Sequence, residues 1–285
     1  MIKALILIFL IPLTYAKSLE VEGQISEDLE LSAISCLSNK LCLLASDETN
    51  HLQSFKIINN KLVVSNKEIK LGKFENENDI EGLTHDGVYF YAIGSHGLSK
   101  KAGRFHQSRY KLFQLLIGKA GDLLELNELP LSQLLSIHPK LKKYYKKELN
   151  KNGINIEGLA YERGSLYIGF RAPLIEGRAQ ILRVSLKDFS LNASELFSID
   201  LEGEGIRSLE FFKGGLYGAS GASLPGAKQI SSFFKADLNT LKVKSREVPY
   251  LESKLEGFEF LNDEETLLIY DSEKDGMPTI FKPAL

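Results

Sequence analysis

The sequence predicts an all-β chain folded as a five-bladed β-propeller, with a six-bladed ring as the alternative. The first observation is a recurring I-E-G-L motif, at Ile80–Leu83 and Ile156–Leu159, with a conservative copy at Leu255–Phe258. The second is a pair of degenerate copies, Leu31–Ile34 and Ile206–Leu209, in the gaps between them. A repeat of this length that contains short strands is typical of propellers.

The motif also sets the period of the repeat. The equivalent positions are taken as Ser32, Glu81, Glu157, Ser208 and Glu256, so the successive steps are 49, 76, 51 and 48 residues. The long step is interpreted as a repeat of ordinary size that carries an insertion. With 285 residues and 44% hydrophobic content, the chain can bury the core of one large domain.

The N-terminal segment has the features of a signal peptide. Residues 1–16 contain a lysine, an apolar run too short to span a bilayer, and a small residue, Ala16, before Lys17. We expect a secreted or periplasmic domain over residues 17–285, with no stable membrane insertion after cleavage. An uncleaved anchor is the alternative. The net charge of −2 gives no indication of a nucleic-acid partner.

The two cysteines lie in adjacent β-rich runs. Cys36 and Cys42 flank Ser38-Asn39-Lys40, which is typical of a short hairpin loop. A three-residue loop would pair Leu37 with Leu41 and place the cysteines opposite each other. In an oxidising compartment this predicts a disulfide, while two buried free thiols are the alternative.

Each repeat then divides into four apolar, β-rich runs separated by turn residues, except the last, which has three. Residues 19–25, LEVEGQI, precede the first repeat and have no other partner. We therefore predict that they complete the fifth blade and remove two exposed sheet edges.

The segment Pro130–Asn150 is not β-like, and its leucine spacing predicts two short helices broken at Pro139. It forms the small helical insertion after the second blade. Its lysine run is interpreted as a solvated helix face. A protein-binding patch is the alternative.

The repeat brings together candidate metal ligands. These are Ser32, Glu81, Glu157, Ser208 and Glu256, one from each blade, at the start of the strand nearest the axis. Converging carboxylates repel one another unless a cation or protons neutralise them. Oxygen ligands without His or Cys suit Ca²⁺. Two alternatives are ion pairs with neighbours such as Arg207, and a carboxylate cluster that shares protons.

Charged loops are expected at the mouth of the channel. One side would be basic, and the other would be acidic, with residues from blades one and five: Asp47, Glu48, Asp271, Glu273 and Asp275. The basic side supplies six candidate ligand-binding residues: His96, Arg104, His106, Arg109, Arg171 and Arg178. Guanidinium groups near a Ca²⁺ ion suit a small anionic ligand such as a phosphate ester. Ordinary charged loops are the alternative.

Longer motifs support a family resemblance. The segments NDIEGLTHDGVYFYAIGSH, NIEGLAYERGSLYIGFRA and SLEFFKGGLYGASG resemble the bacterial domain-of-unknown-function family 3616 (DUF3616) over almost the whole mature chain. The chain is more distantly similar to calcium-activated nucleotidases (soluble apyrases) and to esterase-like phytase-related propellers. The resemblance to the nucleotidases implies Ca²⁺ at one Ser or Glu from each blade. Their nucleotide-binding residues have no counterpart here.

Two functional classes follow. The first is a Ca²⁺-dependent hydrolase of a phosphate ester or nucleotide. The second is a non-catalytic propeller that binds a ligand or a protein and whose central metal is structural. A coordination position open to the basic loops would favour the hydrolase.

Overall fold

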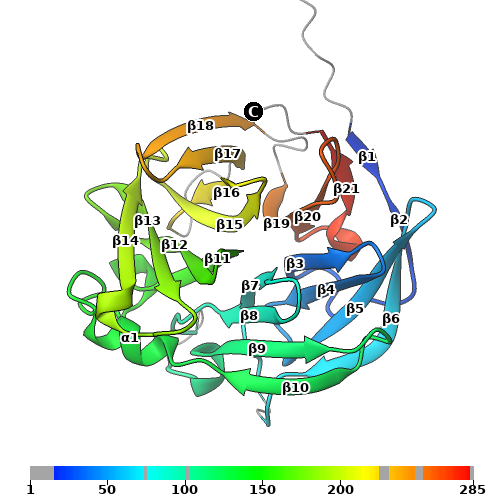
Figure 1. The fold of residues 1–285 in the computed structure, drawn as a ribbon, viewed down its shortest axis with the longest axis horizontal. Helices are drawn as coiled ribbons and strands as arrows, with labels where there is room; N and C mark the ends of the chain where they lie inside the picture. The colour runs from blue at the N-terminus through cyan, green and yellow to red at the C-terminus, as the bar shows by residue number, and fades with distance from the viewer. Residues whose placement is uncertain (1–15, 74–75, 100–102, 225–230, 248–252, 283–285) are drawn as a thin grey trace, which may run out of the picture.

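The structure, a computed structural model, describes residues 16–73, 76–99, 103–224, 231–247 and 253–282. The signal peptide predicted for residues 1–16 lies outside this part of the chain except for Ala16. Five sheets are arranged as blades in a ring (Figure 1). The fold is therefore a five-bladed propeller, and the six-bladed alternative is wrong.

Each blade is an antiparallel sheet whose first strand lies nearest the axis. Blade one contains β3 (Leu31–Ser38), β4 (Leu41–Ser46), β5 (His51–Ile58) and β6 (Lys61–Lys70). Blade two contains β7 (Ile80–His85), β8 (Phe90–Gly94), β9 (Leu112–Ile117) and β10 (Leu123–Glu128). Blade three contains β11 (Asn155–Glu162), β12 (Ser165–Ile175), β13 (Arg178–Ser185) and β14 (Ser194–Ile199).

The other two blades complete the ring. Blade four contains β15 (Glu204–Phe212), β16 (Gly215–Ala222), β17 (Ser232–Asp237) and β18 (Lys242–Glu247). Blade five contains β19 (Lys254–Phe260), β20 (Thr266–Asp271) and β21 (Thr279–Phe281). The inner strands contact in the order β3, β7, β11, β15, β19 and back to β3, so the ring closes.

The inner strands approach so closely that the motif glycines are sterically required. A Cβ at Gly82 would lie 2.8 Å from Leu159 Cβ, and one at Gly158 would lie 2.9 Å from the side chains of Ile206 and Leu209. Contacts below 3.0 Å would force the next blade to move. These glycines therefore allow close packing between blades, and neither has a positive φ.

The N-terminal residues form two short strands instead of one. β1 (Ala16–Ser18) pairs antiparallel with β21, so it is the fourth strand of blade five. β2 (Glu20–Glu22) pairs parallel with β6 at the outer edge of blade one. The prediction that residues 19–25 complete blade five is therefore wrong, because residues 16–18 take that place. The chain crosses from one blade to the next at Leu19, whose side chain is buried between them.

The insertion contains one α-helix where two helices were expected. The helix α1 (Leu131–Ile137) is followed by turns and a 3-10 turn at Leu149–Lys151. Leu134, Leu135 and Leu141 are buried in the core shared by blades two and three. The four lysines of the run are exposed: Lys142, Lys143, Lys146 and Lys147. The alternative of a protein-binding patch stays a prediction.

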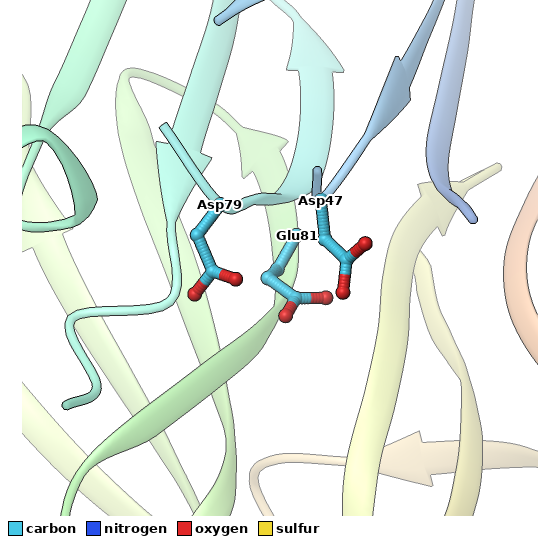
Figure 2. A group of neighbouring side chains, drawn as sticks. All are labelled: Asp47, Asp79 and Glu81. Carbon is cyan, nitrogen blue, oxygen red and sulfur yellow. The ribbon is translucent and has the colours of Figure 1, made fainter. Parts of the chain in front are cut away.

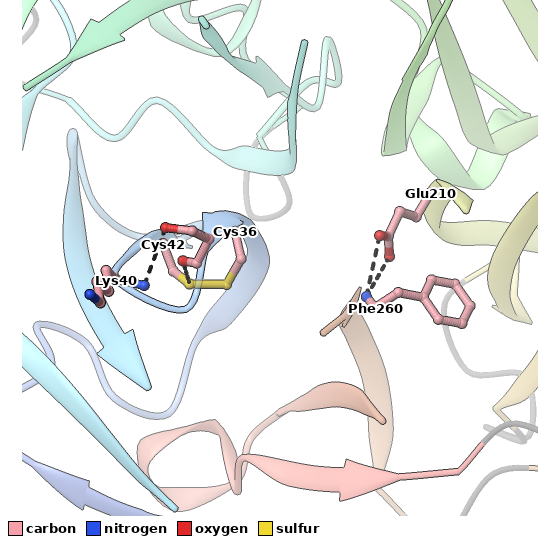
Figure 3. Close-up of a disulfide and its surroundings, with 6 residues drawn as sticks. Cys36, Lys40, Cys42, Glu210 and Phe260 are labelled. Atoms are coloured by element: carbon pink, nitrogen blue, oxygen red, sulfur yellow. Dashed lines mark hydrogen bonds between the residues drawn. A yellow bond between two sulfur atoms is a disulfide. The ribbon is translucent and has the colours of Figure 1, made fainter. Parts of the chain in front are cut away.

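The predicted disulfide joins Cys36 to Cys42 across the β3–β4 hairpin, with a Cα–Cα distance of 4.0 Å (Figure 3). The register skips Leu37, because Leu41 pairs with Ser38 instead. Closing so small a loop stabilises the fold by about 2 kcal/mol in the chain-entropy model. A structural disulfide indicates an oxidising compartment. In the described part of the chain, none of the helices reaches the length and apolarity that crossing a bilayer requires.

Removal of β1 should destabilise the ring. A chain that begins at Leu19 loses the backbone pairing with β21, at about 0.5–1.5 kcal/mol per hydrogen bond, and leaves the edge of β21 exposed. We expect the unfolding free energy to fall by about 2 kcal/mol, and Tm by about 4–8 °C. Calorimetry of this chain and of a control that begins at Ala16 measures the effect. Equal Tm values for the two chains would contradict the role of β1.

Candidate metal and ligand site on the propeller axis

A β-bulge occurs near the start of every inner strand. In blade two, Ile80 pairs with Gly94 and Gly82 pairs with Ile93, so Glu81 is left between two pairs. The same skip in the other blades isolates one residue each: Ser32, Glu157, Arg207 and Glu256. A bulge bends its strand and re-aims the extra side chain. We call these five bulged residues the axial ring.

The register corrects the sequence prediction for blade four. Arg207 occupies the bulge, and Ser208 pairs with Ala219 as the next residue of the strand. Ser208 is thus equivalent to Gly82 and Gly158, the small residues at the contact between blades. The I-R-S-L motif aligned on I-E-G-L places Arg207 at the glutamate position. The sequence prediction took Ser208 instead, because it gave a residue with an oxygen ligand preference over the position that the alignment indicates.

Arg207 joins the carboxylates of two other blades. Its Nη1 lies 2.7 Å from Glu157 Oε2 and 3.2 Å from Glu256 Oε1. Its Nη2 donates to Ala222 O at 2.7 Å. The side chain is 1% exposed. A buried guanidinium therefore ties blades three, four and five together at the axis.

Two further cations approach the same carboxylates. Arg171 Nη1 donates to Glu157 Oε1 at 3.0 Å, and Lys254 is paired with Glu256 and with Asp271, the latter at 2.6 Å. Burial opposes ionisation of Glu157, but Arg207 and Arg171 outweigh it and lower the pKa to about 2. Burial raises the pKa of Glu256 despite the opposing effects of Lys254 and Arg207.

A separate acidic cluster lies between blades one and two. It consists of Asp47, Asp79 and Glu81, whose nearest carboxylate oxygens all lie within 4.8 Å of one another (Figure 2). Asp47 follows β4, Asp79 precedes β7, and Glu81 belongs to the axial ring. Burial, together with the negative charges of Glu157, Asp79 and Asp47, raises the pKa of Glu81 well above its ordinary value.

Arg109 borders the acidic cluster. Its guanidinium is paired with Asp79, and Nη1 lies 3.7 Å from the partly buried Glu77. Ser32, the axial residue of blade one, donates its hydroxyl to Ile80 O at 2.5 Å and so links blades one and two. One carboxylate of the acidic cluster, that of Asp79, is therefore held by a cation of its own blade.

A surface cleft of about 360 Å³ lies beside the acidic cluster. Its lining includes four glutamates from four segments: Glu27, Glu48, Glu68 and Glu77. Glu48 follows Asp47 directly, and Glu77 contacts Arg109. A concave surface of one charge concentrates counter-ions. The cleft therefore favours cations over anions next to the cluster.

The other predicted ligand-binding residues are not gathered at one point. His96 is fully buried, its Nδ1 lies 2.9 Å from Gly94 O, and burial lowers its pKa to about 4, so the ring is neutral at pH 7. Arg104 and Arg178 are exposed, and His106 is partly buried. Arg109 and Arg171 are the two that contact carboxylates near the axis.

The structure thus divides the predicted metal ligands. Glu157 and Glu256 meet around Arg207, whereas Glu81 meets Asp47 and Asp79. Asp79 was not predicted, although it immediately precedes the I-E-G-L motif of blade two. Asp47 was expected on the acidic side of the channel mouth but not as a neighbour of Glu81, because their contact depends on how blades one and two pack.

The family is settled by a comparison with family models. The model described as protein of unknown function (DUF3616) matches residues 30–122 and 118–224. The chain belongs to this family. The match includes the axial residues of the first four blades. No curated protein sequence is significantly similar to this DUF3616 chain.

Solved structures show distant similarity. A putative oxidoreductase (glucose dehydrogenase) of Thermus thermophilus is 14% identical, with a TM-score of 0.49 over 94% of this chain and 99% of that chain. Virginiamycin B lyase from Staphylococcus aureus is 12% identical, with a TM-score of 0.45 over 95% of this chain and 99% of that chain. Neither likeness bears on the activity of the DUF3616 chain, and the likeness to apyrases or phytases is not confirmed.

Glu210 and Glu259 form a pair of carboxyls on the inner strands β15 and β19, three residues beyond Arg207 and Glu256. Glu210 accepts the N–H of Phe260 with both carboxylate oxygens, at 3.2 and 3.0 Å (Figure 3). Burial and the neighbouring Glu259 raise the pKa of Glu210 well above its ordinary value. Burial also raises the pKa of Glu259 to about 8, although Cys36 N–H and the Ser35 hydroxyl donate to it. In this DUF3616 chain the pKa values of both carboxyls at that end of the axis are therefore raised.

The Glu259 carboxyl should make stability depend on pH. Its pKa is about 8 in the folded chain and 4.5 as the reference value, so between these values the folded state binds more protons. The contribution of Glu259 to the unfolding free energy is therefore complete below pH 4.5 and is lost as the pH rises toward 8. The loss is at most about 1.4 kcal/mol per pH unit. We expect Glu259→Gln to reduce this slope, measured by denaturant unfolding from pH 4.5 to 8.

The exposed Glu264, paired with Lys282, provides the control. Its lowered pKa lies below this pH range, so Glu264→Gln should leave the slope as in the unmodified protein. A Glu259→Gln slope equal to that of the control would show that Glu259 does not titrate in this range.

Proposed function

We propose that this protein is an exported calcium-binding β-propeller whose metal ion is held off the axis, between blades one and two. The observation that carries the proposal is the convergence of the Asp47, Asp79 and Glu81 carboxylates within 4.8 Å. Asp47 is 9% exposed, Asp79 3% and Glu81 6%. Arg109 is paired with Asp79, and carboxylates so close and so little hydrated still repel one another unless further cations or protons reduce their charge.

The donor set favours Ca²⁺ among the common cations. All three ligands are hard carboxylate oxygens, one after the end of β4 and two at the start of β7, and Ca²⁺ accepts such oxygens in flexible, irregular geometries together with water. The acidic cleft beside the cluster supports the entry of a cation. The Cys36–Cys42 disulfide supports export to an oxidising compartment, where Ca²⁺ can act as a structural or catalytic ion.

Calcium should stabilise the folded protein through this cluster. At a hundredfold excess over Kd, one ion adds about 2.7 kcal/mol of stability, equivalent to about 5–10 °C in Tm for a domain of this size. A chelator should reverse the shift. Glu81→Gln should abolish it, because the amide keeps the shape of the side chain and removes one ligand charge. Differential scanning calorimetry and elemental analysis make the measurement.

Glu204 is the matched control for that experiment. It is a half-buried glutamate that accepts the Ser220 hydroxyl at 2.6 Å and lies outside the acidic cluster. Glu204→Gln should keep the calcium response. The proposal fails if the unmodified protein contains no metal and its Tm is unaffected by chelator.

Hydrolysis of a phosphate ester is the second candidate function. Arg109 and Arg171 favour it, because both are buried cations close to the carboxylates of the axis and could turn to a bound anion. A bound Ca²⁺ would supply Lewis-acid polarisation of the phosphoryl oxygen and a nucleophilic water. Since the adjacent cleft is acidic, the calcium-loaded protein should bind the anion much more tightly than the metal-free protein.

Phosphate release from nucleotides and sugar phosphates tests this candidate. We expect release to require Ca²⁺ and to be lost in Glu81→Gln, because removal of one ligand weakens metal binding. Arg171→Ala should raise KM while the calcium-dependent shift in Tm is retained, and Arg104→Ala, at an exposed site, should change neither. Calcium binding without phosphate release from any of these substrates would favour the non-catalytic ligand-binding propeller.

A further inference from the structure

The axial ring contains a cation that the chain itself provides. Five bulges bring five side chains to equivalent positions, and four of them offer oxygen atoms as ligands. The fifth, Arg207, is a permanent cation because its guanidinium does not lose its proton in proteins. Its side chain is among the largest fully buried ones in the described part of the protein.

The contacts of Arg207 resemble those of a bound cation. One nitrogen, Nη1, lies 2.7 Å from Glu157 and 3.2 Å from Glu256, whose blades flank blade four on either side. A third oxygen, Ala222 O, accepts from Nη2 at 2.7 Å. Oxygens of three blades thus surround the guanidinium.

The charges around Arg207 also balance. Three carboxylates, Glu157, Glu256 and Asp271, are in contact with three cations, Arg171, Arg207 and Lys254. A divalent metal ion added at this point would bring two positive charges next to a buried guanidinium. Like charges at such distances repel strongly in a desolvated environment.

We propose that Arg207 is a built-in cation that occupies the axial cation site and excludes metal ions from it. The side chain supplies the positive charge that the axial carboxylates need, so the fold of blades three to five does not depend on metal. Removal of the guanidinium converts the axial ring into a divalent-cation site. The inference is carried by the contacts of Arg207 with Glu157 and Glu256, whereas the proposed function is carried by Asp47, Asp79 and Glu81.

Calcium stoichiometry of Arg207→Ser tests this inference. We expect the variant to bind one more Ca²⁺ per chain than the unmodified protein, measured by isothermal titration and equilibrium dialysis with Ca²⁺ alone. Its Tm should fall in chelator by more than that of the unmodified protein and recover in Ca²⁺. Arg207→Lys keeps a positive charge and should gain no additional ion.

A double variant identifies where the additional ion binds. Arg207→Ser combined with Glu256→Gln removes one of the two carboxylates that contact Arg207 and should lose the additional ion. Equal stoichiometry for Arg207→Ser and the unmodified protein would overturn the proposal. It would also be overturned if Arg207→Ser failed to fold in Ca²⁺, because metal would then be unable to replace the guanidinium.

The measurement separates this inference from the proposed function. The stoichiometry of the unmodified protein, one or zero, reports on the acidic cluster alone. The difference between Arg207→Ser and the unmodified protein reports on the axial site alone.

Discussion

The bulge at the start of each inner strand is the constraint on which the rest of the site depends. The residue after the bulge must be small, since at Gly82 and Gly158 a Cβ would lie within 3.0 Å of the next blade. With the strands this close, the extra residue cannot stay in the pleat and turns to the axis. The same packing requirement that closes the ring therefore forces five side chains into a common space.

The charge of an ionised side chain in that space must be compensated. Desolvation of a carboxylate costs several kcal/mol, which is comparable to the whole unfolding free energy of a typical protein. The molecule uses different means on different sides of the axis. In blades three to five, Arg171, Arg207 and Lys254 contact the carboxylates directly. In blades one and two, Arg109 contacts one of three converging carboxylates, and an acidic cleft lies beside them. Asymmetry between blades, rather than the shared fold, therefore determines where an ion can bind.

Sequence reasoning succeeded where the determinants were local. The five repeats and the Cys36–Cys42 disulfide follow from short-range spacing, and the structure confirms both. It failed where the answer depended on register. A shift of one residue exchanged Arg207 for Ser208, and the N-terminal strand of blade five lies three residues before the expected segment. The acidic cluster was equally hidden, because Asp47 and Glu81 belong to different blades and meet only through their packing.

The carboxyls of the inner strands differ in how far nearby cations offset the effect of burial. At the axial ring, cations keep Glu157 ionised, with a pKa of about 2. Three residues further along two of the same strands, burial dominates at Glu210 and Glu259, and the pKa values of both carboxyls are raised. Within the axial ring, burial also raises the pKa values of Glu81 and Glu256, so Glu157, which contacts two guanidinium groups, is the exception. The position of a glutamate along the strand therefore does not by itself decide whether its buried carboxyl stays ionised.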